Sequence, residues 1–493
     1  MTLVAFWLGL LIVALPQELV QDSWLTLVSG REIVQHGLPA TDQLTVWTHG
    51  ARWVDQQWLA QLAFYGLYAL GGVRAAMLAH VAALTAMLSV GVVAARRLGA
   101  SQTSVVLVAL ASLGVAPWSM QLRAQTFAQV LFVLLLWLLA ADSRSPSRRV
   151  FLALPLLALW ANVHGTVVFG ALLVVVRGVL EVFRGRRLRG LVLATVPFAC
   201  VFASPYGFAL AGYYRKLLAN PTLRAFIDEW GPSTPSHKTL LFFLLAAATL
   251  WLLGRNRGRL TAFEQLALVL TLVSGVTAIR SIVWFGLAAL VLLPRLVDPL
   301  MERVPRPTLA GAGAFVLSVL ALVGATAAFG ATRSDAWLMR AWPTAQTHAF
   351  AQAVACDPSL RVLADDRYAD WLLWADPRLR GRVAYDVRFE LFSRHDFFAL
   401  TAYRNRVGSG WRDAARGYGV VFFDPHLQLG VEHGLLANGF GRWYRDGRLS
   451  LLASKPVLDA LARPQDGDAT AAARRLPASG SRGCPRSAAG SRG

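Results

Sequence analysis

The sequence has few charged residues and very few cysteines. Only 15% of its 493 residues are Asp, Glu, Lys or Arg, whereas soluble domains carry about 25%. The three cysteines, Cys200, Cys356 and Cys484, have neither metal-motif spacing nor the pattern of a disulfide framework. These shortages argue against an ordinary soluble enzyme, a disulfide-stapled secreted domain and a zinc module.

Acidic residues are also scarce relative to basic ones. The chain has 28 acids against 48 basic residues, which gives a net charge of +20. In a soluble protein that excess would suggest a nucleic-acid partner. Here most basic residues stand in short clusters between apolar runs, so we interpret them as signals of membrane topology. No nucleic-acid partner is expected.

Apolar residues are abundant, at 56% of the chain with a mean hydropathy of +0.48. Runs such as 105–116, 130–141 and 240–253 are typical of bilayer spans, and membrane lipid is therefore the expected surrounding. We predict an α-helical polytopic membrane protein with about eleven transmembrane helices, near 2–20, 74–95, 103–119, 125–141, 149–163, 165–183, 189–204, 239–254, 262–279, 281–297 and 308–330.

Arginine placement predicts the orientation of these spans. Fifteen arginines fall in five alternate loops, while the opposite short loops contain only Arg123 and Arg280. The positive-inside rule places the arginine-rich side in the cytoplasm. The N-terminus, apolar from Thr2 and without a basic leader, is then a retained span that starts in the cytoplasm.

This orientation divides the chain into three parts. Residues 1–330 form the transmembrane domain, with long outer loops at 21–73 and 205–238. Residues 331–460 alternate β-like and amphipathic runs, which predicts a small extracytoplasmic α/β domain with strands at 361–364, 382–386 and 419–424 and helices at 343–356, 394–406 and 426–438. Residues 461–493 are rich in Ala, Arg, Ser, Gly and Pro and are expected to be disordered.

The first outer loop, 21–73, has the most unusual composition. Its four acids, Asp22, Glu32, Asp42 and Asp55, lie among hydrophobic and aromatic residues, and residues 56–70 can form an amphipathic helix on the membrane surface. Tryptophans alone would indicate an interfacial aromatic belt. The length and acidity of the whole segment favour a functional site.

The order of residues in this loop resembles that of a known group of membrane enzymes. Asp22 directly follows the first span, and a tryptophan, Gly30-Arg31, Gly37-x-Pro-x-x-Asp42, Gly50-x-x-Trp53, a Gln-Trp-Leu and a Gly-Gly follow it. The segment resembles the first outer loop of bacterial proteins in the type-C (GT-C) glycosyltransferase superfamily. The resemblance extends over residues 1–455.

The resemblance implies a function. Members of the superfamily take a sugar from a polyprenyl-phosphate carrier, and an acid in the first outer loop serves as base or metal ligand. By position Asp22 matches that acid, and Asp42 is a second candidate. Gln21 and Ser23 stand where a paired acid would be expected, so a divalent metal is implied by the family but left open by these residues. The expected location is the plasma membrane of a bacterium.

Further polar residues fall on the predicted outer face and match recurring patterns of the same group. His164 is a candidate catalytic residue, and Arg123 and Arg280 could hold a phosphate through charge-assisted hydrogen bonds. Each alone is also explained as an interfacial anchor. Their shared side predicts one polar cavity with Asp22, and the remaining substrate-binding candidates are Gln125, Tyr206 and Glu229.

Two other functions compete with sugar transfer. A transporter or flippase is disfavoured because the acids cluster at one face and no paired broken helices indicate an inverted repeat. A catalytically inactive scaffold of the same fold is supported by the incomplete acid pair. The α/β domain has no glycine-rich nucleotide fingerprint, so we expect it to bind an acceptor or to cover the site. The sugar and the acceptor cannot be identified from the sequence.

Overall fold

A computed structural model describes residues 2–301, eight scattered positions between 313 and 330, and residues 332–357, 359–426 and 428–462. Two compact units emerge. Unit 1 contains residues 1–19, 29–38 and 54–338, and unit 2 contains residues 20–28, 39–53 and the chain from 339 onward. Segments of the first predicted outer loop therefore cluster with the C-terminal part of the chain. The predicted span near 308–330 and the predicted tail lie almost wholly outside the described residues.

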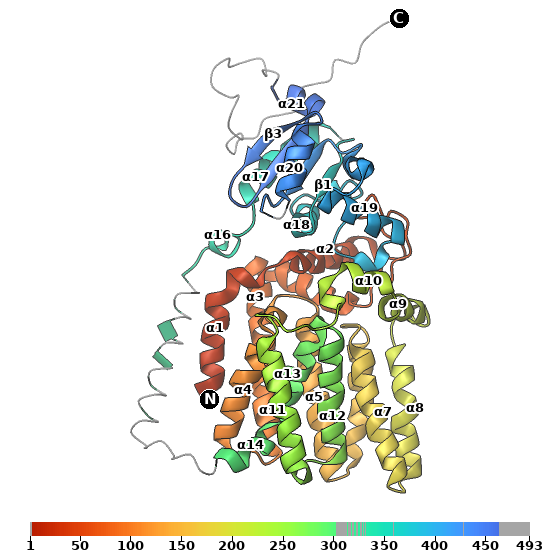
Figure 1. Cartoon of the computed structure of the whole chain (residues 1–493), viewed down its shortest axis with the longest axis vertical. Coiled ribbons are helices and arrows are strands. Elements are labelled where there is room, and N and C mark those ends of the chain that lie inside the picture. Colours follow the sequence, from red (N-terminus) through yellow and green to blue (C-terminus); the bar gives the residue numbers. More distant parts are fainter. Residues whose placement is uncertain are drawn as a thin grey trace, which may run out of the picture. The chain divides into compact units, whose positions relative to one another are not determined.

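Unit 1 is a bundle of helices (Figure 1). The bundle is interrupted by short 3-10 helices, which are η1 (Pro117–Met120), η2 (Arg148–Leu152), η3 (Asp228–Trp230), η4 (Arg257–Arg259) and η5 (Ile279–Ser281). Its helices are α1 (Thr2–Glu18), α3 (Trp58–Arg97), α4 (Gln102–Gly114), α5 (Gln125–Arg144), α6 (Ala153–Trp160), α7 (Val167–Phe183), α8 (Arg187–Val201), α9 (Ala209–Leu218), α10 (Pro221–Phe226), α11 (Leu240–Asn256), α12 (Ala262–Thr277), α13 (Ile282–Leu292), α14 (Pro294–Met301) and α16 (Asp335–Leu338).

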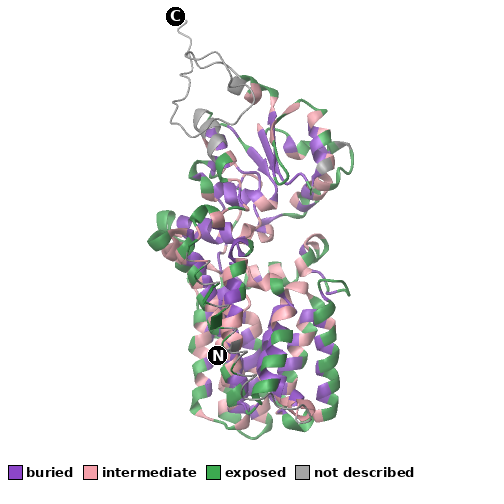
Figure 2. Cartoon of the chain, turned by 90° about the vertical axis from the view of Figure 1, so that its left-hand side faces the viewer, coloured by how far each residue is buried: buried purple, intermediate pink, exposed green. Residues whose placement is uncertain are grey.

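The bundle has apolar side chains both inside and outside. Every residue of α13 is buried, whereas large apolar side chains on α4, α8 and α11 are exposed (Figure 2). An exposed apolar surface of this extent, on helices of this length, is typical of a bundle that faces lipid. Within the described residues, α3, α5 and 240–259 are long and apolar enough to cross a membrane, and two bent helix pairs raise that number to five. The protein is therefore a polytopic membrane protein.

Several predicted spans have a different local structure. The segment near 149–163 is η2 followed by the eight-residue α6, which is shorter than a full span. The predicted loop after the first span begins instead as a helix, α2 (Gln21–His36), at 78° to α1. The predicted surface helix 56–70 is the first part of α3. This part ends at a break within α3, where Gly72 adopts a φ of 66°.

Polar contacts fix the end of α1 to the middle of the bundle. His80 of α3 is buried, and its Nε2 lies 3.5 Å from Glu18 Oε2 and 2.9 Å from the Met120 carbonyl oxygen. The backbone N–H of Leu122 donates to the Glu18 carbonyl at 2.9 Å. These contacts set the position of the residue that follows Leu122, which is Arg123.

Unit 2 is a four-stranded sheet with helices. Strand order is β1-β2-β4-β3, with β1 parallel to β2 and the other pairs antiparallel. The strands are β1 (Val362–Ala364), β2 (Val420–Phe423), β3 (Phe440–Arg445) and β4 (Ser450–Ser454). The helices are α17 (Thr344–Cys356), α18 (Asp366–Ala375), α19 (Arg394–Asn405), α20 (Leu429–Leu436) and α21 (Lys455–Ala462), with 3-10 helices η6 (Pro377–Leu379), η7 (Phe389–Leu391) and η8 (Ser409–Ala415).

The predicted strands are partly correct. The runs at 361–364 and 419–424 form β1 and β2, whose residues are buried throughout (Figure 2). The predicted strand 382–386 is wrong, because only Val383 makes bridges, to Thr45 and to Val362. The chain around Val383 pairs instead with the short first-loop segment 44–47, where the Val46 N–H donates to the Val383 carbonyl at 2.9 Å.

Candidate functional site

Three polar residues predicted on one face come together at one end of unit 1. His164 lies in the turn between α6 and α7, Arg123 lies just before α5, and Arg280 lies in η5 between α12 and α13. The His164 ring is buried and feels the positive charges of both arginines. Burial first, and then Arg280 and Arg123, lower the pKa of His164 to about 3. The imidazole is therefore neutral at any physiological pH.

The hydrogen bonds of His164 identify its tautomer. The backbone N–H of Thr166 points to Nδ1 at 3.3 Å, and Thr166 Oγ1 lies 2.9 Å from the same nitrogen. A backbone N–H can only donate, so Nδ1 accepts and the proton of the neutral ring resides on Nε2. His164 thus holds the turn before α7 with one nitrogen, which accepts from Thr166, and is a hydrogen-bond donor at the other.

The two arginines are positioned by the 3-10 helix η3. Arg123 donates to Gln121 Oε1 at 2.7 Å and lies 3.6 Å from Glu229 Oε2. The Arg280 guanidinium stacks over the Trp230 ring at 4.0 Å, a cation–π contact. η3 and η5 are tied by the Ile279 N–H, which donates to the Gly231 carbonyl at 3.1 Å. The predicted candidate Glu229 is therefore a partner of Arg123.

Residues 55–58 contact the turn that carries His164. Gln56 donates to Tyr213 Oη at 3.1 Å, and its carboxamide lies so close to Gly165 that a Cβ there would meet it at 3.4 Å. The Trp58 indole donates to Asn162 Oδ1 at 2.9 Å. These contacts join the start of α3 to the turn that carries His164.

The segment 55–58 also contributes a buried acid, Asp55. The hydroxyl of the predicted candidate Tyr206 is hydrogen-bonded to the Asp55 backbone, and burial and then the Asp55 carboxylate raise the pKa of Tyr206 above its ordinary value. Asp55 Oδ1 accepts from the Gln57 N–H at 3.3 Å. The end of unit 1 thus combines two guanidiniums, a neutral imidazole, a carboxylate and a phenol. That set can bind a phosphate and accept a proton from a hydroxyl.

The predicted acids Asp22 and Asp42 belong to unit 2. Asp42 is fully buried and accepts from Thr45 Oγ1 at 2.7 Å, Thr48 Oγ1 at 2.6 Å and Arg388 at 2.7 Å. Burial opposes its ionisation, but the charge of Arg388 and these donors outweigh that effect and lower the pKa of Asp42. We assign Asp42 a structural role in unit 2.

Asp22 is half-exposed in the first turn of α2, and its carbonyl accepts from Thr26 Oγ1 at 2.7 Å. Two residues later, the Trp24 ring is buried against three tryptophans of unit 2, with centroid distances of 5.2 Å to Trp342, 4.7 Å to Trp371 and 6.3 Å to Trp374. The first turn of α2 is therefore held firmly within this unit, and Asp22 keeps access to solvent.

The last predicted candidate, Gln125, is half-buried at the first position of α5, two residues after Arg123. Among the described residues, no group of three His, Cys, Asp or Glu side chains could hold an ion.

Sequence reasoning missed Asp55, Gln56 and Tyr213 as members of this site. Asp55 was one acid of four in the loop, and its position next to Gln56-Gln57-Trp58, at the start of a helix, was the available signal. The pairing of Gln56 with Tyr213 joins positions 157 apart, which no local pattern indicates.

Comparisons with known proteins identify the fold. No protein-family model matches the sequence, and the curated proteins include no significant match. Among solved structures, ArnT from Cupriavidus metallidurans in the apo state has a TM-score of 0.52 at 15% identity, covering 93% of this chain and 98% of that one. The apo oligosaccharyltransferase of Archaeoglobus fulgidus has a TM-score of 0.55 at 10% identity, covering 92% and 74%. The oligosaccharyltransferase AglB from Archaeoglobus fulgidus, in complex with an inhibitory peptide and a dolichol-phosphate, has a TM-score of 0.54 at 11% identity, covering 94% and 74%. This chain has the GT-C fold.

Proposed function

We propose that this protein transfers a sugar from a polyprenyl-phosphate donor to an acceptor at the extracytoplasmic face of a bacterial plasma membrane. The observation that carries the proposal is the convergence of Arg123, Arg280 and neutral His164 at one end of a bundle with the GT-C fold. ArnT and AglB are membrane glycosyltransferases that use polyprenyl-phosphate-linked donors, and AglB has been solved with a dolichol-phosphate.

The proposed roles follow from charge and hydrogen-bonding capacity. Arg123 and Arg280 bind the donor phosphate, and His164 donates from Nε2 to a phosphate oxygen. The acceptor hydroxyl attacks C1 of the sugar, the bond between C1 and the phosphate oxygen breaks, and polyprenyl phosphate leaves with the electron pair. A carboxylate takes the acceptor proton. Two positive charges stabilise the phosphate as its negative charge grows.

Two carboxylates are candidates for that base. Asp22 is favoured by its place in the first outer loop and by its access to solvent. Asp55 is favoured by its position in the same unit as the two arginines and by its contacts with Tyr206. Asp22→Asn and Asp55→Asn are isosteric changes, so a comparison of the two separates them.

The test uses the full chain in lipid nanodiscs. Undecaprenyl phosphate binding to wild type is compared with Arg123→Gln, Arg280→Gln and the exposed control Arg215→Gln. Losing a charge-assisted hydrogen bond costs about 1.5–3 kcal/mol, which corresponds to roughly tenfold to hundredfold weaker binding for the two site variants. Equal binding by the control and both site variants would reject the phosphate site. Retained binding by folded protein without sugar transfer from any polyprenyl-phosphate donor would indicate an inactive scaffold.

A further inference from the structure

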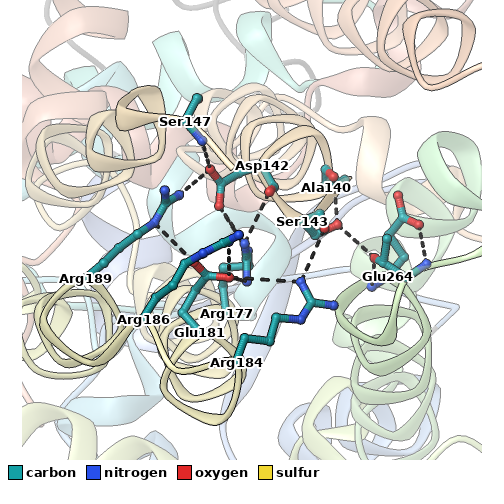
Figure 3. Close-up of polar contacts among 11 residues, drawn as sticks. Ala140, Asp142, Ser143, Ser147, Arg177, Glu181, Arg184, Arg186, Arg189 and Glu264 are labelled. Carbon is teal, nitrogen blue, oxygen red and sulfur yellow. Dashed lines mark hydrogen bonds and ion pairs between the residues drawn. The ribbon is translucent and has the colours of Figure 1, made fainter. Parts of the chain in front are cut away.

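A second charged cluster lies at the arginine-rich end of unit 1, between α5, α7 and the start of α8 (Figure 3). Two buried acids, Asp142 and Glu181, form its centre. Arg177, also buried, donates to Asp142 Oδ2 at 2.8 Å and lies 2.7 Å from Glu181 Oε1. Arg189 bridges the same two acids. The cluster therefore fixes the three helix ends to one another.

The chain also approaches itself closely here. A Cβ on Gly178 would lie 2.6 Å from the Ala194 nitrogen, and one on Gly190 would lie 2.7 Å from the Gly178 oxygen. Small residues at such a crossing allow two helices to contact along their backbones. The loop between α7 and α8 is thus presented on a rigid hairpin.

The cluster has more positive charge than its acids neutralise. Arg186 lies 3.1 Å from Glu181 Oε2, and Arg184 lies 4.0 Å from Oε1 of the same acid and 3.5 Å from the Ser143 carbonyl. With Arg177 and Arg189, four guanidiniums surround two carboxylates. Arg184 and Arg186 remain 42% and 46% exposed, and Arg187 is exposed beside them.

Two large apolar side chains flank these arginines. Phe183 is 83% exposed and Leu188 is 81% exposed, one at each side of the loop that carries Arg184, Arg186 and Arg187. Water is a poor environment for both, whereas acyl chains are a good one. Cationic groups beside exposed apolar groups match the boundary between lipid headgroups and acyl chains.

We propose that this hairpin patch, formed by Phe183, Arg184, Arg186, Arg187 and Leu188, binds the headgroup of an anionic phospholipid. The lipid phosphate meets the surplus guanidiniums, and its acyl chains cover Phe183 and Leu188. A soluble polyanion would satisfy the arginines but not the two apolar side chains. The ligand class is therefore a phospholipid with net negative charge, such as phosphatidylglycerol. This inference is independent of sugar transfer.

The experiment measures lipid binding to the full chain in two ways. Purified protein is titrated with phosphatidylglycerol, phosphatidylcholine or inorganic phosphate, and bound lipid is counted by native mass spectrometry. The thermal midpoint is measured in nanodiscs of phosphatidylcholine alone and of an equal mixture with phosphatidylglycerol. We expect phosphatidylglycerol to bind in preference to phosphatidylcholine and inorganic phosphate, and to raise the thermal midpoint of the protein. Each guanidinium removed should weaken binding about fivefold.

Variants distinguish this patch from general surface charge. Arg184→Gln/Arg186→Gln/Arg187→Gln should lose the preference, and the matched triple Arg255→Gln/Arg257→Gln/Arg259→Gln should retain it. Arg187→Glu leaves the four guanidiniums around Asp142 and Glu181 intact, so it should weaken binding in a protein that still folds. The double variant Phe183→Ser/Leu188→Ser should also reduce phosphatidylglycerol binding. Equal loss in both triples, no preference in wild type, or equal binding of inorganic phosphate would overturn the proposal.

Discussion

Arg388 donates to Asp42 at 2.7 Å, across 346 positions of sequence, and both side chains are buried. The same guanidinium donates to Asp386 Oδ2 and lies 4.2 Å from the centre of the Trp53 ring. One arginine thus fastens segment 39–53, which contains Asp42 and Trp53, to the C-terminal part of unit 2. Removing one partner of a buried ion pair leaves the other charge uncompensated.

We expect Arg388→Met to destabilise unit 2 by about 3–5 kcal/mol, because Asp42 and Asp386 would remain buried without their shared cation. The thermal midpoint followed by tryptophan fluorescence should fall clearly, since Trp24, Trp371 and Trp374 lie in this unit. Arg416→Gln is the matched control, because its pair with Asp413 is exposed and such pairs contribute about 0–1 kcal/mol. A midpoint unchanged by Arg388→Met would contradict this role.

The sequence predicted those parts of the molecule that depend on local pattern. β1 and β2 are buried on both faces, so they are continuous apolar runs that could be recognised directly. β3 was missed because glycine and arginine interrupt its aromatic residues without a regular alternation, and the strand is only half-buried. The buried strand β4 was missed as well. The segment near Val383 has the composition of a strand, but its partner is the distant residue Thr45.

The site was predictable only in part for the same reason. Arginine alternation placed Arg123, His164 and Arg280 on one face, and the structure brings these three together. The contribution of Asp55 depends on long-range contacts such as the one with Tyr206, which sequence spacing does not indicate. The assignment of residues 20–28 and 39–53 to unit 2 likewise depends on packing of Trp24 and on the Arg388 ion pair.

Asp365 should make the stability of unit 2 depend on pH. Burial raises the pKa of Asp365 to about 6 from 3.8, although the Asp424 and Tyr368 N–H groups bind its carboxylate. The folded state therefore binds more protons than the unfolded state between about pH 4 and 6, and the contribution of Asp365 to stability falls as pH rises through this window. Unfolding midpoints of wild type and Asp365→Asn should be measured from pH 4 to 8.

Asparagine keeps the N-cap of α18 through its oxygen and removes the charge, but its amide nitrogen cannot accept from the Asp424 N–H, a loss that does not depend on pH. We therefore expect the stability of the variant relative to wild type to rise between pH 4 and pH 6 and to level off above it. A difference that is constant over the whole range would show that the effect is steric. The opposite slope would show that the carboxylate is stabilised by its donors more than it is destabilised by burial.

Gly178 should be intolerant of a side chain. A Cβ there would lie 2.7 Å from the Gly190 oxygen and from the Leu193 carbonyl carbon, both backbone atoms that cannot move aside easily. Overpacking of this kind costs about 1–3 kcal/mol, so Gly178→Val should lower the thermal midpoint in detergent. Gly254→Val in α11 is the control, because a Cβ there meets nothing within 4 Å. Similar midpoints for the two variants would argue that the α7–α8 hairpin can separate without loss of stability.

His164 should influence sugar transfer without contributing a pH dependence near neutrality. Burial and the two arginines lower its pKa to about 3, so the ring stays neutral from pH 5 to 8. A group of ordinary pKa 6.5 would instead give a rate that changes through that range. Between pH 5 and 8, the transfer rate of wild type should therefore show no titration step that is absent from His164→Asn.

The choice of asparagine separates two roles of the ring. Its side-chain oxygen can accept from the Thr166 N–H as Nδ1 does, so this contact in the turn before α7 is preserved, but the donor at Nε2 is lost. If His164 binds the donor phosphate, the variant should keep its thermal midpoint and bind undecaprenyl phosphate about tenfold more weakly. If the ring only holds the turn before α7, His164→Asn should bind like wild type and His164→Ala should have a lower thermal midpoint. These two variants, measured together, decide whether the buried histidine belongs to the phosphate site.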